Sequence, residues 1–408
     1  MYPADTAPSV ASSSSASISS ETTVEAQLGW LALALTPKMG PTRCGRAAQH
    51  FGGAEKIFAA SLTELEAAGL PAAAAQFVFQ GKARKSAEQQ RELAAIENVT
   101  LLTPIDAAYP ERLLEIFDPP AVLWVRGDAS LLRLPGIAVV GTRHPTPYGA
   151  GMAEKLSRDL SQRGLVIQSG MARGIDTCAH NGALDAYGKT LAVWGTGIDV
   201  IYPKENKRLA ERIVMQGGAL VSEFVPGTFP AVQNFPIRNR VLSGMSVGVL
   251  VVEAAEYSGT RITARCALEQ GREVYAVPGN ATSKGSWTPN TLIKQGAKLT
   301  ATWEDVWEDL PSQVRIELED ALAARRAAES KKGDAASLFS EAEFGTPLSQ
   351  QERLVLELLR QDESTQLDAL LERLSEEVSS AEIFTALFEL ELAGKVRALP
   401  GKHYVRTM

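Results

Sequence analysis

The sequence predicts an α/β fold class in which a doubly wound, Rossmann-like parallel sheet forms the core. Two observations predict the sheet. Between Ile137 and Val277, short runs rich in β-branched residues alternate with helical patterns of about 10–15 residues. The runs, such as "IAVVG", "TLAVWG" and "VGVLVVEA", are apolar almost throughout, which is typical of parallel strands covered by helices on both faces. The ligand crevice of such a sheet lies at the carboxyl ends of its strands.

A small all-helical domain is expected before the sheet. From Leu28 to about Glu97 the apolar residues recur at helical spacing, broken by Pro37, Gly40-Pro41 and Gly52-Gly53. The turn "TPKMGPTR" is similar to the hairpin of helix-hairpin-helix modules, whose backbone N–H groups hold a phosphate, but an ordinary helix-turn-helix packing unit is the favoured interpretation. We therefore assign residues 1–26 to a disordered tail and 27–100 to a helical domain of SAM or helix-hairpin-helix type. We expect residues 101–310 to form a connector and an extended Rossmann-like domain.

The carboxyl-terminal part is expected to hold a linker and a winged helix. Residues 311–346 are rich in Ala and in charge, with few aromatic residues, so we interpret them as a linker that is partly helical. Residues 347–408 show three helical patterns and then "VRALPGKHYVR", which reads as two short strands around a Pro-Gly turn. Three helices followed by a hairpin are the winged-helix pattern.

Composition and charge restrict the function. The three cysteines, Cys44, Cys178 and Cys266, lie far apart without metal-site spacing, which favours a reducing, cytoplasmic location. No signal peptide or membrane span is apparent. The net charge is −7, but it is uneven: residues 1–136 carry 11 basic and 14 acidic groups, residues 137–300 carry 18 and 12, and residues 301–408 carry 12 and 22. A polyanionic partner is therefore expected on the basic middle third.

The loop after the first strand, "VVGTRHPTPYGAG", does not fit a dinucleotide cofactor. It lacks the G-x-G-x-x-G pattern and the acidic residue that follows it about 20 positions later, so no nicotinamide or flavin cofactor is expected. Gly141, Thr142 and Arg143 offer backbone N–H groups, a hydroxyl and a guanidinium, a set that suits a phosphate oxygen. A glycine needed only for a tight turn is the alternative interpretation.

Four further strand-to-helix loops bring small, hydroxyl and basic residues to the same edge. Tyr202 beside Lys204, and Phe235 ahead of the "IRNR" segment, combine phosphate neutralisation with a surface for base stacking. The residues that we expect to contact DNA phosphates are Gly141, Thr142, Arg143, Ser169, Gly170, Gly195, Thr196, Gly197, Lys204, Arg238, Arg240, Ser258, Gly259, Thr260 and Arg261, and those that we expect to stack on bases are Tyr202 and Phe235.

No catalytic residue or metal ligand is predicted in this crevice, because it contains neither a carboxylate pair nor a metal-ligating set. Asp176 and His180 stand at i, i+4 and are expected to form a hydrogen-bonded pair on one helix face. Without a nucleophile beside them, we expect the pair to fix the geometry of the loop.

Several motifs in order resemble the DNA processing protein A (DprA/Smf) family. They are "VGTR", "SGMARGIDTCAH", "GTGIDVIYPKEN", "FPIRNR", "SGTRITARCALEQGREVYAVPG" and "LIKQGA". The resemblance implies a protein without enzymatic activity that binds single-stranded DNA and helps load the RecA recombinase in natural transformation, acting as a homodimer. It places Arg143, Lys204, Arg238 and Arg240 on phosphates.

This chain departs from the family pattern at two places. It has "SGTRIT" where the family commonly has "SGSLIT", which adds Arg261, and its loop "SKGSWTPN" is longer than the usual form, which leaves the role of Asn290 open. The alternative function is a phosphoribohydrolase that splits nucleoside monophosphates on a related core. That class is marked by "PGGxGTxxE", whereas here "PGG" is absent and Thr263 stands where the acid would fall.

Overall fold

The computed structural model describes residues 14–333, 349–360, 364–374, 378–399 and 401–406. The chain divides into two compact units. The first holds residues 1–133, 196–200 and 221–229, and the second holds residues 134–195, 201–220 and 230–408. No helix of the described residues is long and apolar enough to span a membrane.

The first unit is helical in its amino-terminal part, as predicted. Its helices are α1 (Ser14–Leu35), α2 (Pro41–Phe51), η1 (Ala54–Phe58), α3 (Leu62–Ala67), α4 (Ala72–Phe79), α5 (Lys82–Ile96), α6 (Glu111–Leu114) and η2 (Ala129–Arg133). Strands β1 (Thr100–Leu102) and β2 (Leu123–Gly127) pair antiparallel. Helix α1 begins at Ser14, so residues 14–26 are helical rather than a disordered tail; residues 1–13 lie outside the described residues.

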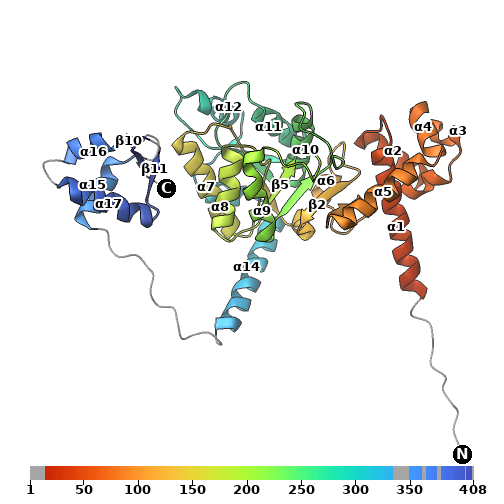
Figure 1. Cartoon of the computed structure of the whole chain (residues 1–408), viewed down its shortest axis with the longest axis horizontal. Coiled ribbons are helices and arrows are strands. Elements are labelled where there is room, and N and C mark those ends of the chain that lie inside the picture. The colour runs from red at the N-terminus through yellow and green to blue at the C-terminus, as the bar shows by residue number, and fades with distance from the viewer. Residues whose placement is uncertain (1–13, 334–348, 361–363, 375–377, 400, 407–408) are drawn as a thin grey trace, which may run out of the picture. The chain divides into compact units, whose positions relative to one another are not determined.

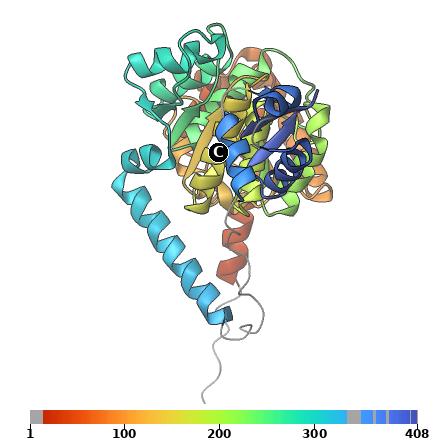
Figure 2. The same cartoon turned by 90° about the vertical axis from the view of Figure 1, so that its left-hand side faces the viewer.

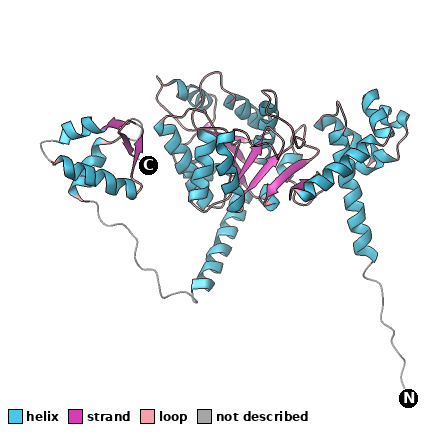
Figure 3. Ribbon diagram, viewed as in Figure 1, coloured by secondary structure: helices cyan, strands magenta, loops and turns pink. Residues whose placement is uncertain are grey.

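The second unit is built on a parallel sheet, which confirms the predicted fold class (Figure 3). Within this unit the strand order is β5-β4-β3-β7-β8-β9, and every one of these neighbours is parallel. The strands are β3 (Gly136–Val140), β4 (Val166–Ser169), β5 (Thr190–Trp194), β6 (Ala219–Ser222), β7 (Gly248–Val251), β8 (Glu273–Ala276) and β9 (Lys298–Leu299). The chain runs from β3 to β5 in one direction and from β7 to β9 in the other. The order therefore reverses between β3 and β7, where a doubly wound sheet opens its ligand crevice.

Helices cover both faces of this sheet (Figure 1). Because crossovers between parallel strands are right-handed, the connections of β3–β5 and of β7–β9 place their helices on opposite faces. Accordingly α7 packs against α8, and α10 packs against α11. The helices are α7 (Pro147–Gln162), α8 (Ile175–Asp185), η3 (Lys204–Asn206), α9 (Lys207–Met215), α10 (Asn234–Met245), α11 (Thr260–Glu269), η4 (Lys284–Ser286), α12 (Trp287–Lys294), α13 (Trp303–Asp309) and α14 (Ser312–Gly333).

The core of the second unit extends beyond the predicted domain. Leu310, Val314 and Leu318 are each 3% exposed and belong to the cluster that also contains Ile137 and Leu156. Helix α14 continues without a break to Gly333 (Figure 2), so the first part of the predicted linker is a helix that packs on the core. Residues 334–346 of that linker lie outside the described residues.

The carboxyl-terminal elements form a winged helix, as predicted. Three helices, α15 (Gln350–Leu358), α16 (Leu367–Leu374) and α17 (Ser380–Leu392), enclose a small apolar core. The strands β10 (Thr365–Gln366), β11 (Val396–Leu399) and β12 (His403–Arg406) form an antiparallel sheet in the order β10-β12-β11. Ser379 begins α17 with a capping box that pairs its backbone and hydroxyl with Glu382.

Candidate nucleic-acid interface

A hollow opens at the carboxyl edge of the sheet, at the point where the strand order reverses. The loop after β3 and the loop after β7 line it, together with residues from the starts of α8 and α10. Its lining includes Gly141, Thr142, Arg143, His144, Asp176, Phe235, Arg238, Asn239, Ser258, Gly259 and Thr260. The structure therefore brings together residues from four of the five loops that the sequence singled out, namely the loops after β3, β4 and β7 and the one that leads into α10.

Basic and aromatic groups of this edge form a cluster. The Arg143 guanidinium lies 6.0 Å from the centre of the Phe235 ring, within the range of a cation–π contact. The Phe235 ring in turn lies 5.6 Å from the ring of Tyr202. Lys204 follows Tyr202 after the cis peptide bond to Pro203 and is exposed. A guanidinium and two rings are thus in contact, and the exposed Lys204 lies two residues from Tyr202 along the chain; we call these four residues the Arg143 cluster.

Glu253 fixes the loop that carries Arg143, and the sequence interpretation missed it. The backbone N–H and the hydroxyl of Thr146 donate to the Glu253 carboxylate at 2.9 and 2.6 Å. The N–H of Thr142 donates to the Glu253 carbonyl oxygen at 2.6 Å, so it is not the open donor that the sequence suggested. Thr146 also caps α7 by accepting from Gly149 N–H. The sequence does offer a sign of this role, because Glu253 is an acidic residue at the end of the otherwise apolar run "VGVLVVEA".

Arg238 is buried and bonded within the protein. Its exposed fraction is 7%, and its Nη1 donates to the carbonyls of Gly170 (2.7 Å) and Val193, which lie at the ends of β4 and β5. Its Nε donates to Asn239 Oδ1 at 3.0 Å. We therefore correct the phosphate contact expected of Arg238, because its donors already hold two strand ends. Arg240, two residues further along α10, is half-buried.

The loop after β4 is likewise engaged internally. The Ser169 hydroxyl is buried and donates to Val139 O at 2.6 Å, and the N–H of Gly170 donates to the Asp176 carboxylate at 3.0 Å. A side chain at Gly170 would overlap the Arg238 guanidinium. Ser169 and Gly170 thus build the edge, although the sequence placed them on phosphates.

Asp176 and His180 do not form the expected pair. The Asp176 carboxylate accepts from the N–H groups of Gly170 and Ala172, so it does fix the loop. Burial raises the pKa of Asp176, and the charge of Arg238 opposes that rise. His180 Nδ1 lies 2.7 Å from Thr190 Oγ1 instead, and burial, helped by the charge of Arg238, lowers the pKa of His180 to about 3. His180 is therefore neutral at physiological pH.

The remaining predicted residues fall into two groups. In the first unit, Thr196 Oγ1 donates to Val200 O and Gly197 N donates to Thr228 O, so both are engaged within the chain. In the second unit, Gly195 leaves room for the Phe235 ring, because a side chain there would lie 3.0 Å from it.

The loop after β7 borders the hollow directly. Thr260 Oγ1 donates to Gly141 O at 3.2 Å, which joins this loop to the loop after β3. Ser258, Gly259 and Thr260 line the hollow, as predicted from their position, whereas Arg261 lines a second hollow that also includes Ser258.

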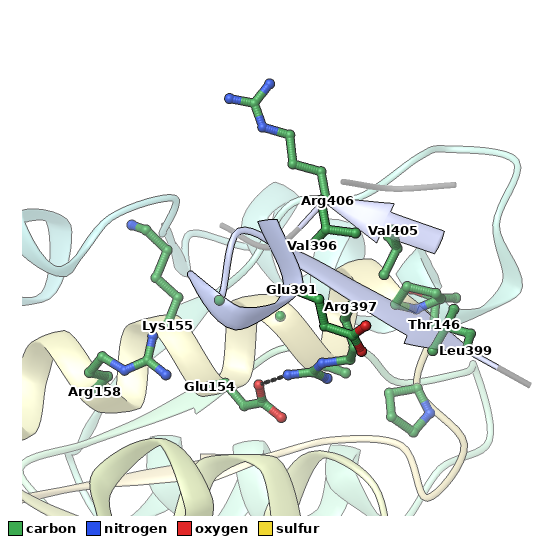
Figure 4. Close-up of a pocket in the computed structure, with 15 residues that line it drawn as sticks. Thr146, Glu154, Lys155, Arg158, Glu391, Val396, Arg397, Leu399, Val405 and Arg406 are labelled. Atoms are coloured by element: carbon green, nitrogen blue, oxygen red, sulfur yellow. Dashed lines mark hydrogen bonds and ion pairs between the residues drawn. The ribbon is translucent and has the colours of Figure 1, made fainter. Parts of the chain in front are cut away.

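Two further basic residues lie away from this edge. Lys155 and Arg158 stand about one turn apart on α7 (Figure 4), and Lys155 Nζ is 3.4 Å from Asp159. Since α7 starts at the edge and rises about 1.5 Å per residue, they lie roughly 12 Å or more along the helix. Among the described residues, no group of three or more His, Cys, Asp or Glu side chains is arranged to hold a metal ion.

The fold and the site define a Rossmann-like protein with a basic, aromatic edge and a winged helix. Residues 100–311 match the family model of DNA recombination-mediator protein A, and residues 341–402 match the DprA winged helix domain. The chain is 44% identical to Protein Smf of Escherichia coli (strain K12) over 309 residues, which cover 75% of this chain and 77% of that one. It is 45% identical to the DNA processing protein DprA of Bacillus subtilis (strain 168) over 226 residues, 55% of this chain and 76% of that one.

A solved structure agrees with these relatives. The X-ray structure of DNA processing protein A from Streptococcus pneumoniae superposes with a TM-score of 0.61 and 33% identity, covering 70% of this chain and 98% of that one. The chain belongs to the DprA/Smf family of DNA-processing proteins. This is a family of recombination mediators, not of enzymes, so the phosphoribohydrolase alternative is set aside.

Proposed function

We propose that this protein binds single-stranded DNA along the carboxyl edge of its parallel sheet and hands the strand to a RecA recombinase during transformation. The Arg143 cluster carries the proposal. A guanidinium and an ammonium group beside two aromatic rings supply phosphate neutralisation and stacking, the combination that holds single strands without sequence preference. The cluster also lies in the part of the chain with a net charge of +6.

The phosphate contacts that we propose centre on Arg143 and Lys204. Both side chains are exposed. In contrast, the Ser169 hydroxyl, the Gly170 N–H and the Arg238 guanidinium already form hydrogen bonds within the protein. Gly141, Thr142, Gly259 and Thr260 shape the hollow beside them, and Arg240 lies on the helix that carries Phe235.

Binding to labelled oligonucleotides, measured by fluorescence anisotropy across salt concentrations, tests this proposal. We expect tighter binding to a single strand than to a duplex of equal length, with a log–log slope of about −0.7 per phosphate contacted. Arg143→Ala and Lys204→Ala should each weaken binding and reduce the magnitude of the slope by about 0.7. Lys189→Ala is the matched control, because this exposed lysine directly precedes β5 at the opposite edge. Equal affinity for duplex, or equal effects of all three variants, would overturn the assignment.

The mediator role needs a separate measurement. We expect the protein to shorten the lag of RecA filament formation on a strand already covered by a single-stranded DNA-binding protein, and Arg143→Ala to lose that effect. Unchanged lag times with a protein that binds the strand normally would reject the mediator role while leaving DNA binding intact.

We also infer a cytoplasmic homodimer. The three cysteines all lie in the described residues and form no disulfide bond there, as suits a reducing compartment. Non-specific contacts to a few phosphates are weak, with a dissociation constant on the order of 10⁻⁴–10⁻⁶ M, and two linked edges raise avidity by roughly 10²–10⁴. Light scattering that reports a monomer at concentrations where DNA binding saturates would contradict the dimer.

A further inference from the structure

Arg261 and Trp287 form a pair beside the crevice. The phosphate contacts that we propose, which centre on Arg143 and Lys204, do not use this pair. The Arg261 guanidinium lies 5.4 Å from the centre of the Trp287 ring. Its Nη1 also donates to Glu256 O at 3.0 Å, which fixes the side chain while leaving other guanidinium donors available. All six tryptophans lie in the described residues, and Trp287, at 38%, is the only one among the exposed large apolar side chains.

The loop that presents Trp287 is bonded to the crevice wall. Ala254 N–H donates to Gly285 O at 2.7 Å, and Thr288 N–H donates to Ala254 O at 3.0 Å. The Thr288 hydroxyl donates to the carbonyl of Ala255, a residue that lines the crevice. Asn290 brackets the same loop, since its side chain exchanges two hydrogen bonds with the backbone of Gly279. Asn290 therefore has a structural role in this loop, and the hydrogen bonds together hold the backbone at Trp287 in place.

The pair continues the line of the Arg143 cluster. Arg143 follows β3 and Trp287 follows β8, and β7 lies between these two strands. Two spacings between neighbouring strands amount to about 10 Å, roughly three nucleotides at the 3.4 Å rise of a stacked strand. Ser258 lines both the crevice and the adjacent hollow that contains Arg261, so the two hollows adjoin.

The charges around the pair favour a base over a phosphate. Arg261, Arg265 and Glu256 line the adjacent hollow, and Arg265 is paired with Glu269 at 2.7 Å. The positive charge there is therefore mostly balanced, unlike that of the Arg143 cluster. An exposed indole held in place by a cation is a stacking surface, and every nucleobase has a face that stacks on it.

We propose that Trp287, held beside Arg261, binds one nucleobase of the DNA strand that crosses the crevice. This assignment rests on the proposed binding of single-stranded DNA. It gives the "SGTRIT" and "SKGSWTPN" segments a joint role, since each supplies one member of the pair. The strand is then anchored by its backbone at the Arg143 cluster and by one base at Trp287.

A scan with abasic sites tests the proposal on the full chain. Each oligonucleotide of the series carries a single abasic nucleotide at a different position and a 5′ anchor that fixes its register. In the wild-type protein we expect one abasic position to weaken binding about 5- to 100-fold, the range that stacking of one base gives. Trp287→Ala should weaken binding to the intact strand by a similar factor and be insensitive to an abasic site at that position. Trp287→Phe, which keeps a ring, should retain most of the affinity and the positional effect.

A surface control and a fold control accompany the scan. Tyr187→Asn removes another exposed aromatic residue, at the end of α8 away from the carboxyl edge, and Asn tolerates its φ of 53°. This variant should bind like the wild type, and all variants should keep the wild-type circular dichroism and melting temperature. If Trp287→Ala binds as tightly as the wild type, or keeps its abasic profile, the base site is wrong. If the wild type itself fails to bind single strands, the proposed function fails with it.

Discussion

Replacing Arg238 with alanine should damage the fold rather than the DNA contacts. The guanidinium holds the carbonyls of Gly170 and Val193, and it is the nearby positive charge for the buried Asp176 carboxylate. Arg238→Ala removes all three interactions at once and leaves a buried acid without its cation. Because the side chain is only 7% exposed, solvent cannot readily replace these interactions.

The magnitude follows from the partners that are left behind. Removing one member of a buried charged pair costs about 3–5 kcal/mol, and each buried carbonyl left without a donor costs about 1–3 kcal/mol unless water enters the space. We therefore expect Arg238→Ala to lower the free energy of unfolding by about 4 kcal/mol if water enters the space and bonds the two carbonyls, and by more if it does not. With a urea m-value of about 2 kcal/mol/M, the midpoint falls by roughly 2 M.

Equilibrium urea unfolding, followed by tryptophan fluorescence, measures this loss. The buried Trp194 ends β5 next to the bonded carbonyl of Val193 and reports on the affected region. Asp176→Asn in the Arg238→Ala background should recover part of the loss, because the buried charge is then gone. Arg143→Ala, the exposed control, should leave the midpoint unchanged. An Arg238→Ala protein with wild-type stability and lost DNA affinity would refute this reasoning and return Arg238 to the phosphate contacts.

Three further predictions follow from the core and the winged helix. His180 should make the protein less stable in acid: its pKa is lowered to about 3 in the fold against about 6.5 in the unfolded chain, so its contribution is complete above pH 6.5 and is lost as the pH falls toward 3. Between pH 8 and pH 5 this amounts to about 2 kcal/mol, which urea titrations should detect in the wild type and find reduced in His180→Gln. Leu318→Ala should cost about 2–5 kcal/mol in the same assay, whereas a substitution in a true linker would cost almost nothing. Deleting residues 347–408 should change the affinity for single strands by less than about twofold, since α17 exposes Glu382 and Glu389, which repel phosphates; a larger loss in anisotropy titrations would make the winged helix a DNA contact.

The sheet could be predicted because its strands are buried on both faces. A short segment such as "VGVLVVEA", rich in valine and alternating with helical patterns, favours a buried parallel strand, and the reversal of strand order places the crevice. Predicting which loops meet there required only this topology. Arg143 stands three residues after β3, whereas Tyr202 lies eight residues after β5, just before η3.

The direction of each side chain was harder to predict. Arg238 and Arg240 are neighbours in sequence, but two residues turn an α-helix by about 200°, so only one of them can face the same side as the core. Arg238 is spaced like Val241, Leu242 and Met245, all of which are buried. That helical spacing indicates that Arg238 is buried. The phosphate contact was nevertheless predicted, because the "FPIRNR" motif of the family resemblance is basic. Val314 and Leu318 are likewise spaced as one buried helix face, but the many charged residues around them favoured a linker.

The hydrogen bonds that join the loops at this edge also bear on the rate of binding. Thr142 is bonded to Glu253, Ile175 to Thr142, and Thr260 to Gly141, so neighbouring loops hold one another in place. Little of the protein then remains to be ordered when a strand arrives, and the entropy lost on association is mainly that of the DNA. Binding should therefore resemble docking onto a rigid surface, with an association rate set by diffusion and by charge rather than by rearrangement of the protein. If a single strand binds here as proposed, its nucleotides rather than the loops are therefore expected to reorganise on binding.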